Sequence, residues 1–373
     1  MKPNSKIIIV SVTNDLSHDQ RVNKVCCSLS AQGYRVLLVG RELKDSTPLK
    51  RPYSTKRIKL LFNKGFLFYA FFNWRLFCFL LFKKVDVLHA NDLDTLLANW
   101  LVAKIRRKKI IYDSHEYFTE VPEIQHRPIV KKTWLSIERF IFPKLNHVFT
   151  VNHSIATIYK NKYAVDVKVL RNLPLFEKVD KVKSKEDLQL PSNKTIVILQ
   201  GAGINIDRGA EELLEAIALS EDLFLCIVGG GDVVDYLKKR ASSQDLKNKV
   251  LFTGKLEYNQ MMQYTMNADV GVSLDKDTNI NYRLSLPNKI FDYVKAEIPV
   301  VCSDLKEVAK IINSYNIGVI AKRVVPEDIL GAINLVSSEN RKSSYLPNLK
   351  KALDVLNWEN EVKLLIQTYK NLE

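Results

Sequence analysis

The sequence has few of the residues that build metal centres or disulfide frameworks. Its 373 residues include six histidines and five cysteines, and none of them shows the spacing of a metal site. The cysteines are Cys26, Cys27, Cys78, Cys226 and Cys302. They stand in apolar segments, as reduced and packed thiols do. We therefore expect neither a metal ion nor a disulfide, and a cytoplasmic location.

Other familiar signatures are missing as well. The first apolar run, Ile7–Val12, is too short and too early for a cleavable signal, so we expect a buried strand there. No HExxH or Ser–His–Asp arrangement stands out. There is also no zinc-finger, RNA-recognition or single-strand stacking signature. These absences weigh against metalloproteases, triad hydrolases and the common nucleic-acid-binding modules.

Acidic residues are scarce in the first half of the chain. Residues 1–172 hold 30 Lys and Arg against 13 Asp and Glu, whereas residues 173–373 hold 26 against 28. The whole excess behind the net charge of +15 therefore lies in the first half, which indicates an anionic partner. Nucleic acid and the anionic face of a membrane are the candidates, and a merely solvated basic surface is the alternative.

The apolar runs predict two α/β domains, for which the chain is long enough. In both halves continuous apolar strands alternate with helices, which is typical of parallel sheets covered on both faces. In the first half we expect strands at 6–11, 34–39, 85–89, 109–113 and 148–151, and helices at 20–32 and 98–105. In the second half we expect strands at 195–199, 223–228, 250–252, 270–274 and 299–302, and helices at 209–219, 258–266 and 287–295.

A break in this alternation falls at 173–194, where Pro174, Pro191 and a mixed-charge run predict a linker. The predicted fold class is therefore α/β, with two Rossmann-like doubly wound domains facing across a cleft. In open sheets of this kind, ligands bind outside the carboxyl ends of the strands.

The aromatic-rich segment 66–82 approaches the length of a transmembrane helix. Asn73 and Arg75 lie in its middle, and a central Arg costs at least ~2.5 kcal/mol on insertion scales. We favour a helix of the first domain that is partly packed and partly lies on a membrane surface. An ordinary core helix is the alternative, and a full span is the least favoured interpretation.

Two segments of the second half carry groups suited to phosphate. In the first, glycines including Gly203 follow a strand, Arg208-Gly209 opens a helix, and Gly230 lies in the glycine run that ends the next strand. Glycines let backbone N–H groups approach an anion, and Arg208 adds a charged donor. A tight glycine-rich turn without a ligand explains the same residues equally well.

The second segment places small donors and a cation near a helix start. Ser285, Asn288 and Lys289 suit a phosphate, and Asp292, one turn further on, can accept two hydroxyl hydrogen bonds, as a ribose offers. A surface acid in the first turn of a helix is the alternative for Asp292.

Five stretches of the second half occur in a recognisable order. They read Gly201…Arg208-Gly209, Val228-Gly229-Gly230-Gly231, Val250-Leu251-Phe252-Thr253-Gly254, Ala268-Asp269-Val270 and Pro287-Asn288-Lys289-Ile290-Phe291-Asp292-Tyr293…Pro299-Val300. The order resembles the nucleotide-binding half of GT-B glycosyltransferases, in particular glycosyltransferase family 4. The first half also fits, through Asp19-Gln20-Arg21-Val22, Asp86-Val87-Leu88-His89 and Tyr112-Asp113-Ser114-His115-Glu116. The resemblance thus covers essentially the whole chain.

This resemblance implies a set of domains. Residues 1–172 would be the N-terminal acceptor domain, 173–194 the linker, and 195–355 the nucleotide-sugar-binding domain. Residues 356–373, which contain Trp358-Glu359, would form a final helix that returns to the first domain.

The resemblance also implies roles for the donor-binding residues. Arg208 and Lys289 would neutralise the diphosphate, Asp292 would hold the ribose, and Lys255 and Leu256 would meet the base. The chain departs from the family at three positions. Asp292 stands where Glu is common, Leu284 stands where a second Glu often contacts the sugar, and Ala202 replaces one phosphate-binding Arg.

For the reaction, the resemblance implies a retaining transfer without an essential metal or other cofactor, the nucleotide-diphosphate sugar being the co-substrate. Asp92-Leu93-Asp94 reads as the Asp-x-Asp of other glycosyltransferases, but it lies in the first half, so we expect no metal there. The candidate catalytic residues are His115, Asp92 and Glu116, and a structural histidine is the alternative for His115. Arg21 and Asn91 are candidates for the acceptor or a phosphate, with a surface ion pair as the alternative for Arg21.

The sequence therefore predicts a glycosyltransferase that moves a sugar from a nucleotide-diphosphate sugar to a growing, lipid-linked surface glycan such as a lipopolysaccharide or capsule. It would be cytoplasmic and peripheral at the inner membrane face, with an anionic membrane surface and no nucleic acid as partner; the sequence predicts no oligomeric state. The alternatives are a sugar-nucleotide epimerase on the same fold and a basic nucleic-acid- or membrane-binding protein without catalysis.

Overall fold

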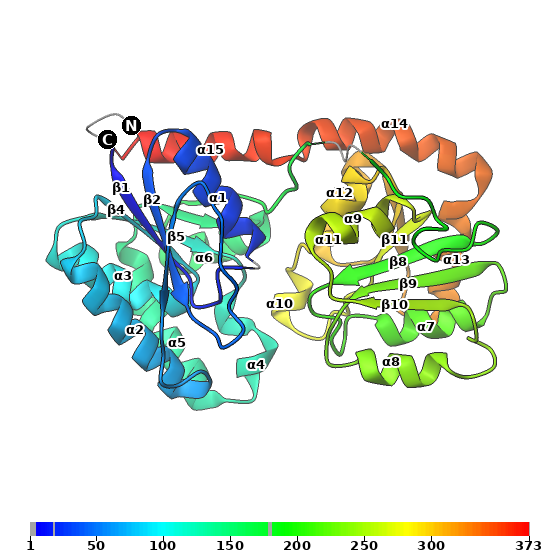
Figure 1. The fold of residues 1–373 in the computed structure, drawn as a ribbon, viewed down its shortest axis with the longest axis horizontal. Coiled ribbons are helices and arrows are strands. Elements are labelled where there is room, and N and C mark those ends of the chain that lie inside the picture. The colour runs from blue at the N-terminus through cyan, green and yellow to red at the C-terminus, as the bar shows by residue number, and fades with distance from the viewer. Residues whose placement is uncertain (1–4, 18, 178–180, 373) are drawn as a thin grey trace. The chain divides into compact units, whose positions relative to one another are not determined.

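The computed structural model describes residues 5–17, 19–177 and 181–372, and for residues 339–343 the backbone alone. The chain divides into two compact units (Figure 1). The first unit comprises Met1–Asn172 and Glu361–Glu373, and the second comprises Leu173–Asn360. Each unit is built on its own parallel β-sheet.

The sheet of the first unit has seven strands in the order β3-β2-β1-β4-β5-β6-β7. Ile9 on β1 is aligned with Leu37 on one side and Leu88 on the other, and all three face apolar neighbours. Strand order reverses between β1 and β4, and doubly wound sheets bind ligands outside the carboxyl ends of such a pair. The strands are β1 (Ile7–Ser11), β2 (Arg35–Arg41), β3 (Ser54–Ile58), β4 (Val87–Asn91), β5 (Lys109–Ser114), β6 (Val148–Thr150) and β7 (Val167–Val169).

Helices cover this sheet, with α2 and α3 lying together over one face (Figure 1). The side chain of Asp19 caps α1 by accepting a hydrogen bond from the amide of Val22, and Gly33, with φ +88°, follows its end. Within the last helix, the residues from Glu361 onward belong to this unit. The helices are α1 (Gln20–Ala31), α2 (Gly65–Phe82), α3 (Leu93–Ile105), α4 (Pro122–Gln125), α5 (Pro128–Ile141), α6 (His153–Tyr163) and α15 (Trp358–Lys370).

Helix α2 is the segment that approaches transmembrane length. It buries one stripe of side chains at every fourth position, Phe68, Phe72, Leu76 and Leu80, against the sheet and α3. Asn73 also packs on α3, because its amide donates to the carbonyl of Asp94 at 2.7 Å. The helix is long and apolar enough to cross a membrane by length and composition, and only 22% of it is buried in the protein. Its outer face is therefore apolar and exposed.

The second unit contains a six-stranded parallel sheet in the order β10-β9-β8-β11-β12-β13. Strand order reverses between β8 and β11, which defines the corresponding binding position of this unit. Its strands are β8 (Thr195–Gly201), β9 (Leu223–Gly229), β10 (Val250–Gly254), β11 (Val270–Ser273), β12 (Val300–Ser303) and β13 (Gly318–Ala321). Its helices are α7 (Ala210–Ala218), α8 (Val234–Ala241), α9 (Tyr258–Met266), α10 (Ile280–Arg283), α11 (Lys289–Lys295), α12 (Lys306–Tyr315), α13 (Pro326–Ser337) and α14 (Glu339–Val355).

The expected α/β architecture with two doubly wound sheets is confirmed. The strand expected at 85–89 is β4, which spans Val87–Asn91. The carboxylate of Asp86 accepts a hydrogen bond from the amide of Ile7, and the strand begins after this residue. The edge strand β3 was not predicted, since its sequence STKRI is mostly exposed and lacks an apolar run. Within the segment expected as a linker, Leu188 and Leu190 are buried in the core of the second unit.

Candidate functional site

In the second unit, polar side chains meet where β8 and β11 end. Arg208 lies between β8 and α7, and its Nη1 donates to Oδ2 of Asp275 at 3.2 Å. The guanidinium also lies over the ring of Tyr282, 4.7 Å from its centroid. Asp275 is 1% exposed, yet its Oδ1 has no hydrogen-bond partner in the described part of the chain, and neither has Nε of Arg208. Buried polar atoms are normally paired, so this cluster is arranged for a further polar group.

Glycines bring the backbone close around this cluster. Gly209 has a φ of +72°, and a Cβ there would lie 2.4 Å from the carbonyl oxygen of Leu274. A Cβ on Gly230 would meet the side chain of Lys255 at 2.9 Å, so this lysine packs across the end of β9. A Cβ added to Gly203 would make only ordinary van der Waals contacts, with the side chain of Asn205. Packing in the protein itself therefore requires a glycine at 209, where the Leu274 backbone is in the way, whereas at 230 only the flexible side chain of Lys255 would have to move.

Lys289 begins α11 and is electrostatically coupled to the same cluster. Burial lowers the pKa of its ammonium group, Asp275 raises it, and the neighbouring Arg208 lowers it. Arg208 is the cation paired with Asp275, and Lys289 adds a second positive charge nearby, which leaves a net positive charge suited to an anion. Near the start of α11, Asn288 is exposed, and the buried Oγ of Ser285 has no hydrogen-bond partner among the described residues.

Asp292 is buried, which excludes the surface acid considered as its alternative. Its Oδ2 accepts from Nε2 of Gln200 at 3.0 Å, and its Oδ1 accepts from the hydroxyl of Tyr258 at 2.9 Å. Burial and this carboxylate raise the pKa of Tyr258. A carboxylate has about four acceptor positions, so each of its oxygens can accept more than one hydrogen bond. Leu284 is buried, and Leu256 packs against the core of the unit.

In the first unit, Arg21 and Asp113 form a buried bidentate ion pair. Nε and Nη2 of Arg21 donate to the two carboxylate oxygens at 3.0 and 2.7 Å, and Nη1 donates to the carbonyl of Leu170. Arg21 is 4% exposed, so it differs from both expectations, a phosphate ligand and a surface ion pair. Its position on the inner face of α1 buries the guanidinium, and the protein itself uses it. Although burial raises the pKa of Asp113, Arg21 and His115 hold it well below its usual range.

His115 follows β5 and lies between two carboxylates. Its Nδ1 is 3.3 Å from Oδ2 of Asp92, and its Nε2 is 3.4 Å from Oδ2 of Asp113 and 3.1 Å from Oδ1 of Asn91. Burial lowers the pKa of the imidazole, but Asp92 and Asp113 outweigh it and raise the pKa to about 9. At neutral pH the ring is therefore an imidazolium that can donate a proton or stabilise negative charge.

The carboxylates of the Asp-x-Asp sequence face different partners. Asp92, whose φ is 56°, accepts the amide of His115, and burial raises its pKa. Asp94 accepts from the hydroxyl of Thr13 at 2.5 Å, and burial together with Asp92 raises its pKa to about 7. Across residues 5–17, 19–177 and 181–372, no group of three or more His, Cys, Asp or Glu is placed to hold a metal ion. Glu116 is partly exposed beside His115.

The structure thus gathers Asn91, Asp92 and His115 in the first unit, and Arg208 and Lys289 in the second. Sequence reasoning missed the central carboxylates of both clusters, Asp113 and Asp275. Each comes at or just after the carboxyl end of a predicted strand, which is the signal that could have found them.

Two doubly wound sheets, with a cationic cluster at the switch point of the second, define a GT-B glycosyltransferase. Residues 20–172 match the family model described as Glycosyltransferase Family 4. Residues 180–352 match the model described as Glycosyl transferases group 1. Together these matches span most of the chain, which is a GT-B glycosyltransferase similar to family 4 and group 1.

Solved structures show the same fold at low sequence identity. Sucrose-phosphate synthase from Thermosynechococcus elongatus superposes with a TM-score of 0.80 and 17% identity, over 99% of each chain. A glycosyltransferase from Rickettsia africae gives 0.77 and 14%, again over 99% of each chain. Anabaena HepE in complex with UDP-glucose gives 0.75 and 14%, over 98% of this chain and 100% of the other. No curated protein sequence matches this chain.

Proposed function

We propose that this glycosyltransferase moves a sugar from a nucleotide-diphosphate sugar to a growing, lipid-linked surface glycan, with retention of configuration and without a metal or other cofactor. The observation that carries the donor assignment is the cluster of Arg208, Asp275 and Lys289. It combines two cations, one carboxylate and unpaired polar atoms at the switch point of the second sheet.

In this proposal Arg208 and Lys289 bind the diphosphate, and Ser285 and Asn288 lie beside it at the start of α11. Asp292 accepts from the ribose, while Lys255 and Leu256 meet the base. Two fixed cations stabilise the negative charge that develops as the nucleoside diphosphate leaves, so they lower the barrier without a metal ion. The similarity in fold to a protein solved with UDP-glucose supports a uridine diphosphate sugar as the first donor to test.

The sugar itself would meet an unusual environment. Leu284 is buried and apolar at the position where the family often has an acid. Asp275 is the carboxylate in contact with Arg208, and its Oδ1 has an open acceptor position. We infer that Asp275 accepts from a donor hydroxyl in place of that acid.

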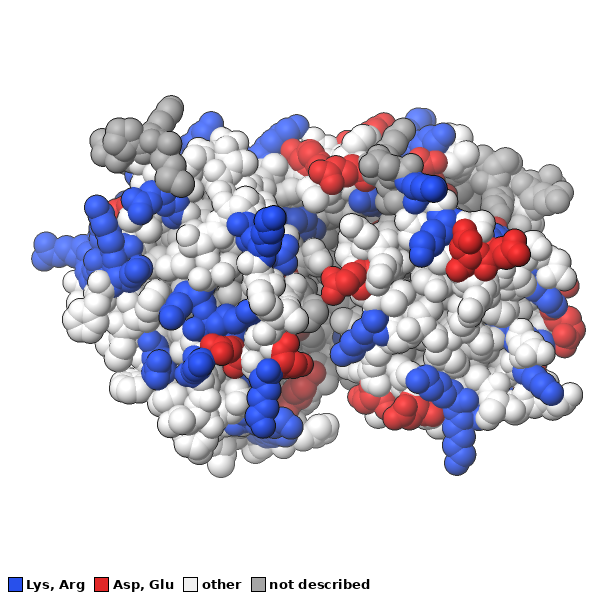
Figure 2. All heavy atoms as spheres, viewed as in Figure 1, with Lys and Arg blue, Asp and Glu red and all other residues white. Residues whose placement is uncertain are grey.

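The first unit would receive the acceptor. In its cluster the imidazolium of His115 supplies positive charge and a proton, with Asn91, Asp92 and Glu116 around it. Lysine and arginine predominate among the charged side chains of this unit on the face shown in Figure 2, whereas both signs are mixed over the second unit. This charge supports an anionic, lipid-linked acceptor and a position at the cytoplasmic face of the inner membrane.

The donor assignment is tested by titrating nucleoside diphosphates and their sugars into the protein by calorimetry. Arg208→Ala and Lys289→Ala should each weaken binding by roughly 30-fold to 100-fold, because each removes a charged hydrogen bond to phosphate. Lys306→Ala, at an exposed lysine of the same unit, is the matched control. Undiminished affinity in both variants would overturn the site. If the protein converted the donor to an isomer in the absence of any acceptor, it would be an epimerase and not a transferase.

A further inference from the structure

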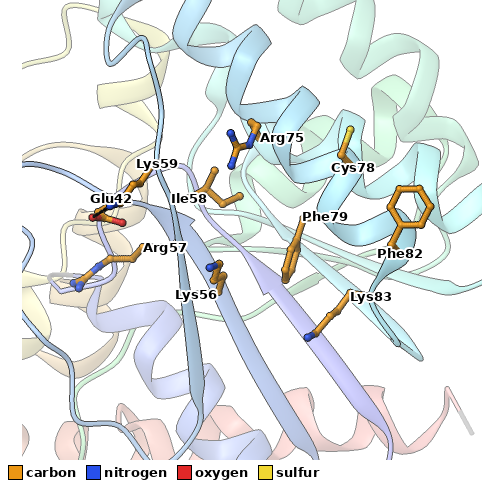
Figure 3. A pocket seen from close by; sticks show the side chains of 10 residues that line it. All are labelled: Glu42, Lys56, Arg57, Ile58, Lys59, Arg75, Cys78, Phe79, Phe82 and Lys83. Atoms are coloured by element: carbon orange, nitrogen blue, oxygen red, sulfur yellow. Dashed lines mark ion pairs between the residues drawn. The ribbon is translucent and has the colours of Figure 1, made fainter.

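The first unit has a pocket of about 600 Å³ between the edge strand β3 and helix α2 (Figure 3). None of its lining residues belongs to either candidate site. Figure 3 shows that the lining side chains come mainly from two elements: Lys56 and Ile58 from β3, and Arg75, Phe79 and Phe82 from α2. The pocket is therefore formed within one unit by residues that the proposed transfer reaction does not use.

The charge around this pocket is strongly one-sided. Lys56, Arg57, Lys59, Arg75 and Lys83 line it together with a single acid, Glu42. Two of the cations are engaged, since Arg57 pairs with Asp15 at 3.3 Å and Lys59 pairs with Glu42 at 3.7 Å.

The other three cations, Lys56, Arg75 and Lys83, make no ion pair within residues 5–17, 19–177 and 181–372, and all three are exposed. Three unpaired positive charges around one hollow attract an anion.

The same pocket has an apolar side. Phe82 is 85% exposed, Phe79 packs partly against the core, and Ile58 forms part of that core. A small, fully polar anion would leave the ring of Phe82 in water. An anion that carries an apolar chain would cover it and gain the hydrophobic free energy of that burial.

The outer face of α2 extends this apolar surface. Phe66, Leu67 and Trp74 are each more than half exposed, and basic residues flank the helix at Lys64 and at Lys83-Lys84. An exposed apolar face with basic ends is typical of a helix that lies in the interface of a membrane. Helix α2 also forms one wall of the pocket, with Cys78 and Phe82 four and eight residues after Trp74, so a lipid in contact with this face would lie beside the pocket.

We propose that this pocket binds the phosphate head group of an anionic phospholipid, with Lys56, Arg75 and Lys83 around the phosphate and Phe79 and Phe82 against the first part of the acyl chain. This inference rests on the membrane location in the proposed function and adds a lipid site separate from the acceptor. A lysine on an edge strand ordinarily prevents that strand from pairing with another sheet. The proposal gives Lys56 a second role, in binding the phosphate.

The test compares two triple variants of the full chain with equal net charge. Lys56→Glu, Arg75→Glu and Lys83→Glu together change the pocket. Lys160→Glu, Lys306→Glu and Lys310→Glu change three exposed lysines outside it. Sedimentation with vesicles at low salt uses phosphatidylcholine alone and phosphatidylcholine mixed with phosphatidylglycerol.

Wild type should bind only the mixed vesicles. The pocket variant should lose affinity on the order of 100-fold or more, and the control variant far less. Phe82→Ser should also weaken binding, while leaving its salt dependence in place. Equal losses in the two triple variants, or unchanged binding in the pocket variant, would overturn the proposal.

A second measurement separates a lipid from a free anion. Monomeric short-chain phosphatidylglycerol should raise the melting temperature of wild type but not of the pocket variant, and inorganic phosphate at the same concentration should do neither. An equal shift with inorganic phosphate would show an anion site without lipid recognition and overturn the proposal. Nucleoside-diphosphate binding should persist in all of these variants. A failure of the lipid-site proposal would therefore not affect the donor-site proposal, and a failure of the donor-site proposal would not affect the lipid test.

Discussion

Arg208 donates a hydrogen bond to one carboxylate oxygen of Asp275 at 3.2 Å, while the other oxygen of that buried carboxylate has no hydrogen-bond partner among the described residues. The pair therefore presents both a charged donor and an open acceptor at the end of β11. A diphosphate with a sugar attached offers complementary groups to both.

Asp275→Asn should separate these two functions. Removing the negative charge beside Arg208 and Lys289 should raise affinity for a nucleoside diphosphate roughly threefold to tenfold, because less charge competes with the phosphate. Sugar transfer should fall, since the acceptor for the donor hydroxyl is weakened. Calorimetry and a transfer assay check the two effects. Asp277→Asn, at the exposed partner of Arg283, is the matched control and should change neither. Lower affinity for the diphosphate in Asp275→Asn would contradict this account.

The pKa of His115 predicts a pH dependence of stability. The folded protein raises this pKa from 6.5 to about 9, mainly through Asp92 and Asp113 against the effect of burial. The stabilisation is therefore complete below about pH 6.5 and is lost as pH rises through about 9. It amounts to at most about 3.5 kcal/mol, the free energy that corresponds to a rise in pKa from 6.5 to about 9. Urea unfolding of wild type and His115→Gln across this range checks it, because the difference between the two should shrink at high pH. A difference that is constant with pH would refute the prediction.

Breaking the pair of Arg21 and Asp113 should destabilise the first unit. Arg21→Ala leaves a fully buried carboxylate without its bidentate partner, which costs about 3–5 kcal/mol. The measurement is the unfolding transition of the first unit, followed separately from that of the second, since two units need not unfold together. Arg323→Ala, in the exposed pair with Asp328, serves as a control and should have little effect. A small effect of Arg21→Ala would show that the pair is dispensable for folding.

Two glycines with the same φ angle allow a matched test of close packing. Gly209 and Gly254 both have a φ of +72°, but a Cβ would lie 2.4 Å from Leu274 only at Gly209. Gly254→Ala should therefore cost about 1 kcal/mol in the second unit, from backbone strain alone. Gly209→Ala should cost clearly more and should also weaken nucleotide binding, because it displaces the start of α7. Thermal unfolding and calorimetry measure both effects, and equal costs would argue against the steric clash.

The sequence by itself determined the α/β architecture, because continuous apolar strands alternating with helices can be buried only in sheets covered on both faces. It also predicted which short segments would approach a phosphate, since Arg208-Gly209 and the segment from Ser285 to Asp292 follow strand ends. Edge strands such as β3 escaped prediction because one exposed face and an unpaired edge do not require an apolar run.

The partners of each charge were decided only by the tertiary structure. Arg21 and Asp113 are 92 residues apart, and Arg208 and Asp275 are 67 apart, so no local pattern could pair them. The partners differ for the same residue type. Arg21 is a buried cation in a bidentate ion pair, whereas Arg208 is a partly exposed cation whose Nε has no hydrogen-bond partner among the described residues. The hollow between β3 and α2 likewise exists only after a basic edge strand and an aromatic helix have packed on one sheet. Local sequence sets the secondary structure, but the burial and the neighbours of a charge depend on chain segments that only the fold brings together.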